Sequence, residues 1–235
     1  AQRFNIMEPY KHTTKKGKTK WYRVGYFIPE DTRTDKYGLT IFDFKKLYGK
    51  GEKTVDATFK FNNNEFAWVF NSEKYIAEKN ETGDEQLFFE TYVVNFDPLF
   101  SPLKGKWVNV LLNAKWAKDG FLHLWIDGKL RSSYYGDTMS DAKSSRFKFG
   151  PYRYDMTQAT DSGLKIPDIK VRYSNVGKAD KCEDLWSGCS EIISQLTDKS
   201  QLNGVRVVAY CKTAFKTDGG ASCRNLGYPK NQRPF

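Results

Sequence analysis

The fold is decided by the sequence Gly105-Lys-Trp-Val-Asn-Val-Leu-Leu-Asn-Ala-Lys-Trp116, followed by Ala117-Lys-Asp-Gly120 and Phe121-Leu-His-Leu-Trp-Ile-Asp-Gly-Lys129. Apolar and polar residues alternate in both runs, as in strands that bury one face. The Asp-Gly pair between them is typical of a hairpin turn. The stretch therefore predicts a β-hairpin whose buried face carries Val108, Val110, Leu112, Ala114, Leu122, Leu124 and Ile126.

The same alternation recurs along most of the chain, between turns rich in Gly, Asn, Asp and Lys. A helical period occurs only near the C-terminal end, over 183–196. About nine short strands at this spacing predict an all-β fold, a β-jelly roll of the concanavalin A-like sandwich type. The predicted strands cover residues 21–28, 39–45, 54–61, 65–70, 86–96, 107–116, 121–126, 147–154 and 169–173.

The composition points to a folded protein with an acidic partner. The 235 residues include 38 Lys and Arg against 28 Asp and Glu, a net charge of +10, and 39% hydrophobic residues. This excludes a disordered tail, and no apolar run is long enough for a membrane span. Nucleic acid, an anionic membrane and an acidic polysaccharide all fit the charge. The sequence has no recognition helix, RNP-type strand or zinc finger, so nucleic acid is disfavoured.

All the cysteines lie in the last 54 residues, at Cys182, Cys189, Cys211 and Cys223. Their spacing does not match paired zinc ligands, and an even number favours two disulfides that staple a C-terminal appendage. We therefore expect a jelly-roll domain over 1–179 and a small extension over 180–235 packed on it. Disulfides indicate an oxidising compartment, and a start at Ala1 without an apolar leader fits a mature secreted chain.

The hairpin also carries a possible sugar-binding face. Asn109 and Asn113 fall on the side opposite the buried set, together with His123 and Trp125 of the returning strand. Amides that bond hydroxyls and an aromatic ring that stacks on a sugar are typical of a carbohydrate cleft. The alternative is an ordinary exposed face with one Trp at its edge.

A second polar face is predicted in the run Arg146-Phe-Lys-Phe-Gly-Pro-Tyr-Arg-Tyr154. Phe147 and Phe149 alternate inward, so the outward side carries Arg146, Lys148 and, after a kink at Gly150, Tyr152 and Tyr154. Positive charge beside a phenol favours the phenolate, which can act as a base and then as an acid. The alternative is a Tyr and Lys ladder that only holds strands together.

These runs resemble jelly-roll polysaccharide lyases of the glucuronan lyase and heparin lyase I type, to which alginate lyases are related in fold. The likeness covers about residues 21–175 and rests on a G-K-W strand, a D-G turn, a W-x-D-G-K strand end and the run Phe147-Lys-Phe-Gly-Pro-Tyr-Arg153. The last run corresponds to the Y-F-K-x-G-x-Y strand of the family. An early W-Y strand and the run Thr40-Ile-Phe-Asp-Phe-Lys45 also fit. The resemblance implies β-elimination of a uronic-acid polysaccharide.

The resemblance also implies roles for particular residues. Tyr152 falls on the catalytic tyrosine of the family and Lys148 on the lysine before it. Asp43 and Lys45 fall where the family has Gln and His, a departure that leaves the imidazole missing unless His123 supplies it. An ionised Asp43 would repel a uronate unless it is protonated or paired with Lys45.

We therefore expect a secreted, monomeric polysaccharide lyase that binds an acidic polysaccharide, with no nucleic acid, membrane or cofactor. A structural Ca²⁺ is compatible with the resemblance. The alternative is a lectin-like module that binds acidic glycans without catalysis. The expected catalytic residues are Tyr152, His123 and Lys45, and the expected substrate-binding residues are Lys148, Arg146, Tyr154, Asn109, Asn113, Trp125 and Asp43.

Overall fold

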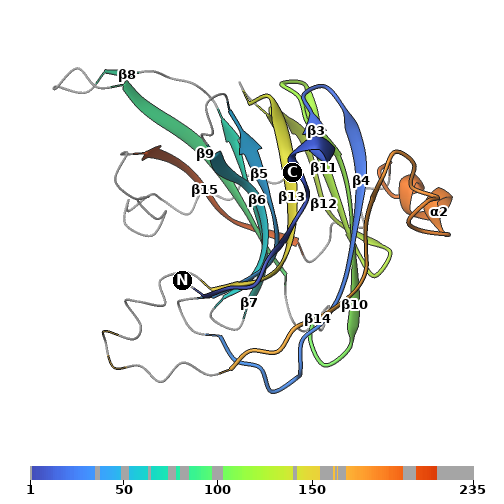
Figure 1. Cartoon of the computed structure of the whole chain (residues 1–235). Coiled ribbons are helices and arrows are strands. Elements are labelled where there is room, and N and C mark those ends of the chain that lie inside the picture. The colour runs from blue at the N-terminus through green and yellow to red at the C-terminus, as the bar shows by residue number, and fades with distance from the viewer. Residues whose placement is uncertain are drawn as a thin grey trace.

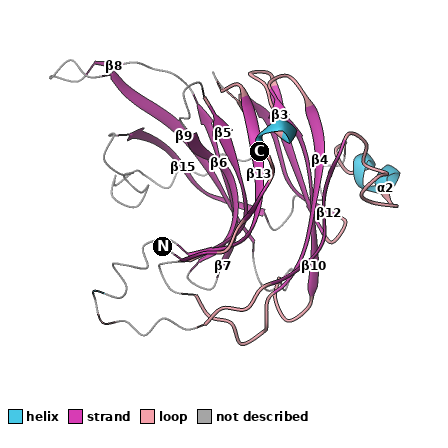
Figure 2. Ribbon diagram, viewed as in Figure 1, coloured by secondary structure: helices cyan, strands magenta, loops and turns pink. Residues whose placement is uncertain are grey.

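A computed structural model of the chain gives the fold and the placement of most of its residues. It describes residues 2–34, 38–48, 53–62, 65–73, 78–79, 85–96, 103–139, 142–153, 161, 163, 168–197 and 205–215. The all-β prediction is confirmed, because two antiparallel sheets pack face to face as a jelly-roll sandwich (Figure 1). The described helices are only the short η1 (Tyr10–His12) and α2 (Cys189–Ser194) (Figure 2).

The larger sheet, called the large sheet below, contains the strand with the predicted catalytic tyrosine. Its order is β1 (Gln2–Arg3), β13 (Ser144–Arg153), β5 (Leu39–Leu47), β6 (Lys53–Asn62), β7 (Glu65–Glu73), β9 (Glu85–Phe96) and β15 (Val205–Phe215). Two further short strands, β2 (Ile6–Met7) and β3 (Thr14–Lys15), also pair with β13, and β8 (Glu78–Lys79) pairs with β9. N-terminal strands therefore line the side of β13 that faces away from β5.

The second sheet, called the small sheet, contains the hairpin that decided the fold. Its order is β12 (Lys129–Gly136), β11 (Gly120–Ile126), β10 (Trp107–Lys115), β4 (Thr19–Phe27) and β14 (Arg172–Ala179). The predicted buried residues of the hairpin are all buried in the core. The next turn has positive φ at Asp127 and Gly128, 49° and 76°, as a two-residue type I′ turn requires. Strand β12 was not predicted, because its buried positions include Ser132.

The core between the sheets is mainly aromatic. Phe42 of β5 stacks on Phe59 of β6 with ring centroids 5.3 Å apart. From the small sheet, Tyr22 packs edge-on against Phe44 at 4.8 Å. The Tyr22 hydroxyl accepts a hydrogen bond from the Trp116 indole at 3.0 Å and shares another with Thr14 at 2.7 Å. The polar atoms of Tyr22, Trp116 and Thr14 thus satisfy one another, which offsets the cost of burying them.

Residues 182–197 form a cap on the outer side of the small sheet, which we call the C-terminal cap. Cys182 and Cys189 form a disulfide, and with Ile192 they cover a second hydrophobic cluster, whose members in the small sheet are Trp21, Leu111, Trp125 and Leu130. The Trp125 indole donates to the Ile192 carbonyl at 3.0 Å. One of the two predicted disulfides is therefore confirmed. The Cys211 side chain and Cys223 lie outside what the structure describes.

The C-terminal region differs in detail from the predictions. The helix expected over 183–196 is only α2, which begins after Gly188, and the strand expected over 169–173 is β14. Strand β14 ends at Ala179, and β15 pairs with β9 as part of the large sheet. The division at residue 179 stays a prediction. No helix within the described ranges is long and apolar enough to span a membrane.

The disulfide is expected to hold the C-terminal cap on the small sheet. Closing a loop of this length contributes about 2 kcal/mol, so Cys182→Ser/Cys189→Ser should raise the population of the detached cap roughly thirtyfold. Limited proteolysis of the folded protein should then cleave the cap correspondingly faster. The matched control is Ser187→Ala/Ser190→Ala, at exposed positions of the same segment. Equal cleavage rates in the two variants would contradict this role.

Candidate active site

The candidate active site lies on the face of the large sheet that points away from the core. Strands β13 and β5 are neighbours, with Arg146 opposite Lys45, Lys148 opposite Asp43, and Tyr152 opposite Thr40. Phe44 and Phe147 between them turn into the core. The two runs singled out in the sequence therefore lie side by side and present their polar residues on one face. The large sheet curves around this face (Figure 1).

Lys148 and Asp43 form a buried ion pair on this face. The Lys148 ammonium is 2.9 Å from the Asp43 carboxylate, and the two side chains are 2% and 4% exposed. Lys148 is therefore engaged within the protein, although the sequence led us to expect it to hold substrate. The expected partner of Asp43 was Lys45. The pairing offsets the charge of Asp43, so this carboxylate does not leave the face negative.

Tyr152 is half-buried next to an irregularity in β13. The register with β5 shifts between Phe149 and Tyr152, where Gly150 has a φ of 115°. A Cβ at Gly150 would lie 2.2 Å from the Phe4 carbonyl oxygen, so only glycine fits. The predicted kink is confirmed, and it returns Tyr152 to the outer face, between the backbones of Thr40 in β5 and Arg3 in β1.

Lys60 of β6 belongs to this face and was missed in the sequence analysis. It lies opposite Thr40, which in turn lies opposite Tyr152. Lys60 and Thr58 alternate with the buried Ala57, Phe59 and Phe61, so the period of this strand was the signal that could have found it. Across two strand spacings, the Tyr152 and Lys60 backbones are roughly 10 Å apart.

Arg146 is held at the edge of the face by the N-terminal segment. Its Nε donates to the Glu8 carbonyl at 2.6 Å, and its guanidinium lies 4.1 Å from the centre of the Tyr10 ring. Tyr152, Thr40 and Lys60 form one row across the strands. Arg146 and Lys45 form a second, positively charged row several residues farther along β13. Tyr154, the other predicted binding residue, lies outside the described residues.

His123 and Trp125 do not line an open cleft, and that prediction was wrong. Both lie on β11 of the small sheet, on its outer face, whereas Tyr152 lies on the outer face of the other sheet. Trp125 is fully buried under the C-terminal cap, and His123 is 3% exposed. His123 bonds Ser133 at 3.1 Å and stacks on Phe121 at 4.6 Å. Burial lowers the pKa of His123 to about 4.

Asn109 and Asn113 share that outer face of the small sheet and so do not join Tyr152 either. The Asn109 side-chain oxygen accepts from Arg23 at 2.8 Å. The guanidinium of Arg23 lies over the ring of Trp186 in the cap, 4.9 Å from its centre. These contacts tie the cap to the sheet. The alternation in the sequence gave the correct face but could not reveal that residues 182–197 cover part of it.

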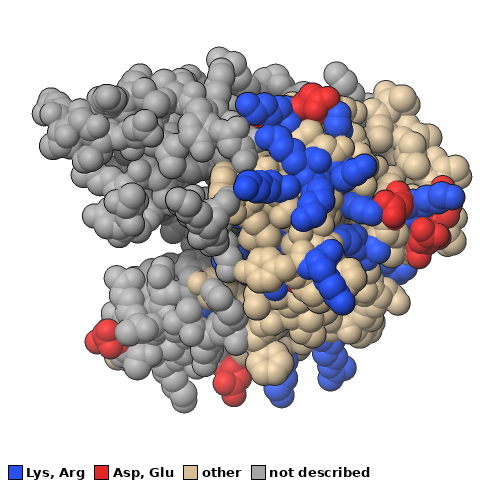
Figure 3. Space-filling model, turned by 45° about the horizontal axis from the view of Figure 1, so that its top comes forward, with Lys and Arg blue, Asp and Glu red and all other residues tan. Residues whose placement is uncertain are grey.

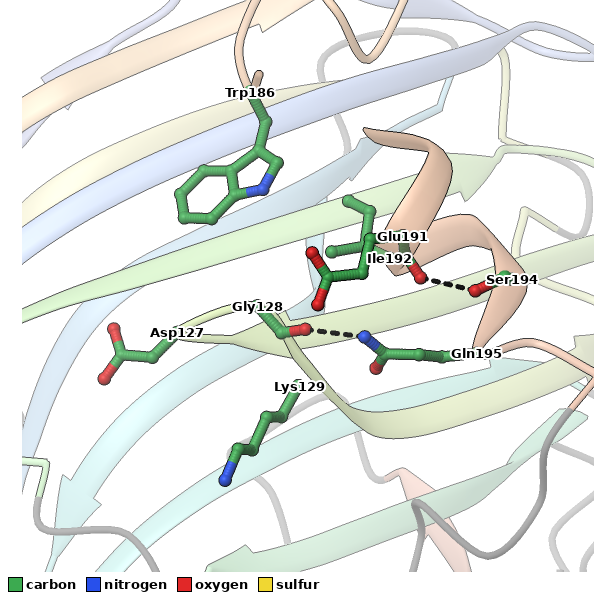
Figure 4. A pocket seen from close by; sticks show the side chains of 8 residues that line it. All are labelled: Asp127, Gly128, Lys129, Trp186, Glu191, Ile192, Ser194 and Gln195. Carbon is green, nitrogen blue, oxygen red and sulfur yellow. Dashed lines mark hydrogen bonds between the residues drawn. The ribbon is translucent and has the colours of Figure 1, made fainter. Parts of the chain in front are cut away.

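A pocket remains between the cap and the β11–β12 turn (Figure 4). Trp186 and Glu191 of the cap face Asp127 and Lys129 of the turn across it. Gln195 closes one side by donating to the Gly128 carbonyl at 2.8 Å and accepting from the Leu130 amide at 2.7 Å. The carboxylates of Asp127 and Glu191, against the single cation Lys129, make this pocket unfavourable for a polyanion. The large-sheet face is therefore the better candidate for an acidic substrate.

No cluster of three or more His, Cys, Asp and Glu side chains suited to a metal occurs in the part of the chain that the structure describes. The structure therefore assigns no residues to the Ca²⁺ that the resemblance allows.

Comparison with known proteins agrees with the fold just described. Residues 4–166 match the family model described as polysaccharide lyase. The chain belongs to this family. The resemblance seen in the sequence is thereby confirmed, and the protein is a polysaccharide lyase that acts on a polysaccharide substrate. No curated protein sequence is significantly similar to this lyase.

Solved structures similar to this lyase include the endo-β-1,4-glucuronan lyase from the fungus Trichoderma reesei. It is 19% identical, with a TM-score of 0.56, and the match covers 77% of this chain and 75% of that one. An alginate lyase, A1-II′, is 10% identical with a TM-score of 0.46, over 75% of this chain and 70% of that one. The binding domain of botulinum neurotoxin serotype C1 is 14% identical with a TM-score of 0.47, over 79% and 38%. The first likeness supports the jelly-roll fold.

Burial of His123 predicts a loss of stability in mild acid. With a pKa of about 4 when folded and an ordinary value near 6.5 when unfolded, only the unfolded state binds this proton near pH 5. Lowering the pH from 7 to 5 should therefore cost about 2 kcal/mol of unfolding free energy through this residue. In His123→Gln, the unfolding free energy measured with urea should change correspondingly less between pH 7 and pH 5. The exposed His12 gives the control, and a His12→Gln variant that reduced the change equally would contradict the assignment.

The buried ion pair predicts strong coupling between Lys148 and Asp43. Lys148→Met leaves the Asp43 carboxylate buried without this partner and should reduce the unfolding free energy by about 3–5 kcal/mol. Lys148→Met/Asp43→Leu should recover most of that loss, because both charges are removed together. Urea unfolding of the two single variants and the double variant measures the coupling. If the loss of unfolding free energy in the double variant equalled the sum of the losses in the two single variants, the pairing would be contradicted.

Proposed function

We propose that this lyase cleaves a uronic-acid polysaccharide of the glucuronan, alginate or heparin type by β-elimination, with Tyr152 transferring the proton. The supporting observation is the row Tyr152, Thr40 and Lys60 on the outer face of the large sheet. This row combines a phenol and a cation across a width of roughly 10 Å, which accommodates one sugar unit. The second row, Arg146 and Lys45, offers positive charge for a neighbouring unit of the same polymer.

The reaction requires a charge acceptor for the carboxylate, a base and an acid. As the C5–H bond breaks, its proton passes to the base and negative charge builds on the C5 carboxylate. The electron pair then forms the C4–C5 double bond while the bond from C4 to the glycosidic oxygen breaks. That oxygen finally takes a proton from the acid.

In this proposal, the Tyr152 oxygen accepts the C5 proton and returns it to the leaving oxygen. Lys60 stabilises the charge on the substrate carboxylate. Lys148 acts indirectly, by offsetting Asp43 beneath the substrate. His123 has no part in this mechanism, because it is buried on the opposite sheet.

We also propose that the lyase acts outside the cell. The Cys182–Cys189 disulfide supports this, because such bonds persist mainly in oxidising compartments. An acidic polysaccharide substrate is consistent with the same location. The net charge of +10 would draw a polyanionic substrate toward the protein.

Tyr152→Phe tests the assignment directly, because it removes only the hydroxyl. We expect turnover to fall by about 10²- to 10⁴-fold while binding of the polymer is largely kept. The ultraviolet absorbance of the new C4–C5 double bond measures turnover on glucuronan, alginate, heparin and pectate. Tyr135→Phe is the matched control, since Tyr135 is 68% exposed on the small sheet.

Retained turnover in Tyr152→Phe would show that another group transfers the proton. If the unaltered protein binds one of these polymers but produces no double bond, the lectin-like alternative is correct and the proposed reaction is rejected.

A further inference from the structure

A basic pocket, separate from the Tyr152 row, lies where β3 turns into β4. It has a volume of about 700 Å³ and is lined by His12, Thr13, Thr14, Lys15, Lys18, Lys20, Lys178 and Asp180. In Figure 3, Lys and Arg side chains gather on the described part of the face in view, and they outnumber the acidic side chains beside them. The size and the polarity of the pocket suit part of a charged ligand.

Two of the lysines that line this pocket lie on a tight turn of the backbone. The turn from Lys15 to Lys18 is closed by a hydrogen bond from the Lys18 amide to the Lys15 carbonyl at 3.2 Å. Gly17, with a φ of 82°, donates to the Trp116 carbonyl at 2.7 Å. The turn is thereby tied to the end of β10, so the backbone that carries Lys15 and Lys18 is positioned before any ligand arrives. Preorganisation of this kind reduces the entropy lost on binding.

Positive charge in the pocket exceeds what its own carboxylate can offset. Asp180 is the only acidic residue of the lining and pairs with Lys20. The bond from Lys20, with the charges of Lys20, Lys178 and Lys18, lowers the pKa of Asp180. Lys15 and Lys18 are exposed, and no ion pair is found for either within the described ranges. These two ammonium groups are available to an anion.

The pocket is connected to the candidate active site through the segment Glu8 to His12. Lys178 binds the Glu8 carboxylate and the His12 carbonyl. Arg146, at the end of the large-sheet face, binds the Glu8 carbonyl and covers the Tyr10 ring. Cations therefore continue from the Arg146 and Lys45 row around the edge of β13 into the pocket. A polymer lying along β13 would meet them in that order.

We propose that this basic pocket binds a second stretch of the acidic polysaccharide, beyond the units at the cleavage site. The inference rests on the proposed function for the identity of the ligand. Binding there would hold long chains on the enzyme and favour their cleavage over that of short ones. Nucleic acid is the less suitable ligand, because the lining includes no Phe, Tyr or Trp ring on which a base could stack.

The test compares two variants that each remove two positive charges. Lys15→Gln/Lys18→Gln changes the pocket. Lys106→Gln/Lys129→Gln changes the opposite end of the small sheet, where Lys106 pairs with Asp127. Both are made in the Tyr152→Phe background, so that long-chain polyuronate is bound but not cut, and affinity is measured at low salt and at physiological salt. Turnover on a long polyuronate and on a tetrasaccharide is then compared with Tyr152 restored.

We expect the pocket variant to bind the long chain roughly five- to thirtyfold more weakly than the control at low salt, with a smaller difference at physiological salt. The ratio of kcat/KM on the long chain to kcat/KM on the tetrasaccharide should fall in the pocket variant only. Equal affinities of the two variants would overturn the proposal even if Tyr152 proves catalytic. If the pocket variant loses affinity for single-stranded DNA but not for polyuronate, the pocket is a nucleic-acid site and the proposal is rejected.

The experiment tests the proposed reaction and the proposed binding site separately. A protein that cleaves none of the polymers rejects the proposed reaction, while the affinity difference between the two variants still decides whether the pocket holds a polyuronate.

Discussion

The structure depends on the packing of an aromatic layer from the large sheet against the small one. Phe42, Phe44, Phe59 and Phe147 must all turn inward to form this layer. Because successive side chains of a strand point to opposite faces, every buried ring fixes the direction of its polar neighbour. Lys148, Asp43 and Lys60 therefore face outward as a direct result of core packing. The stability of the sandwich and the arrangement of the candidate site have the same origin.

The alternation of apolar and polar residues along the strands was also the reason that much of the fold could be predicted. The hairpin of β10 and β11, the outward placement of Tyr152 and the kink at Gly150 all follow from local sequence. The pairing of Lys148 with Asp43 could not be predicted, because it depends on which residues of β13 and β5 lie opposite each other. Register between strands about a hundred residues apart is set by the whole sheet.

The largest error concerned Trp125 and His123, and its cause is physical. A strand pattern shows which residues share a face but not what covers that face. Here residues 182–197, held by a disulfide, cover Trp125, and neighbouring aromatic residues of the sheet enclose His123. The aromatic and amide residues that looked suited to sugar binding instead contribute to a second hydrophobic cluster and its surroundings. Lys60 lies in a strand without Tyr, Trp or His, so the residue types around it did not mark it as part of a site.

The short strands β1, β2 and β3 have a consequence for the solution behaviour of the lyase. They pair with β13 along the side that does not face β5. Without them, the strand that carries Tyr152 would end the large sheet with unpaired amide and carbonyl groups, which readily recruit a strand from another molecule. By pairing with β13, the N-terminal strands therefore prevent self-association at the strand on which catalysis is proposed to depend.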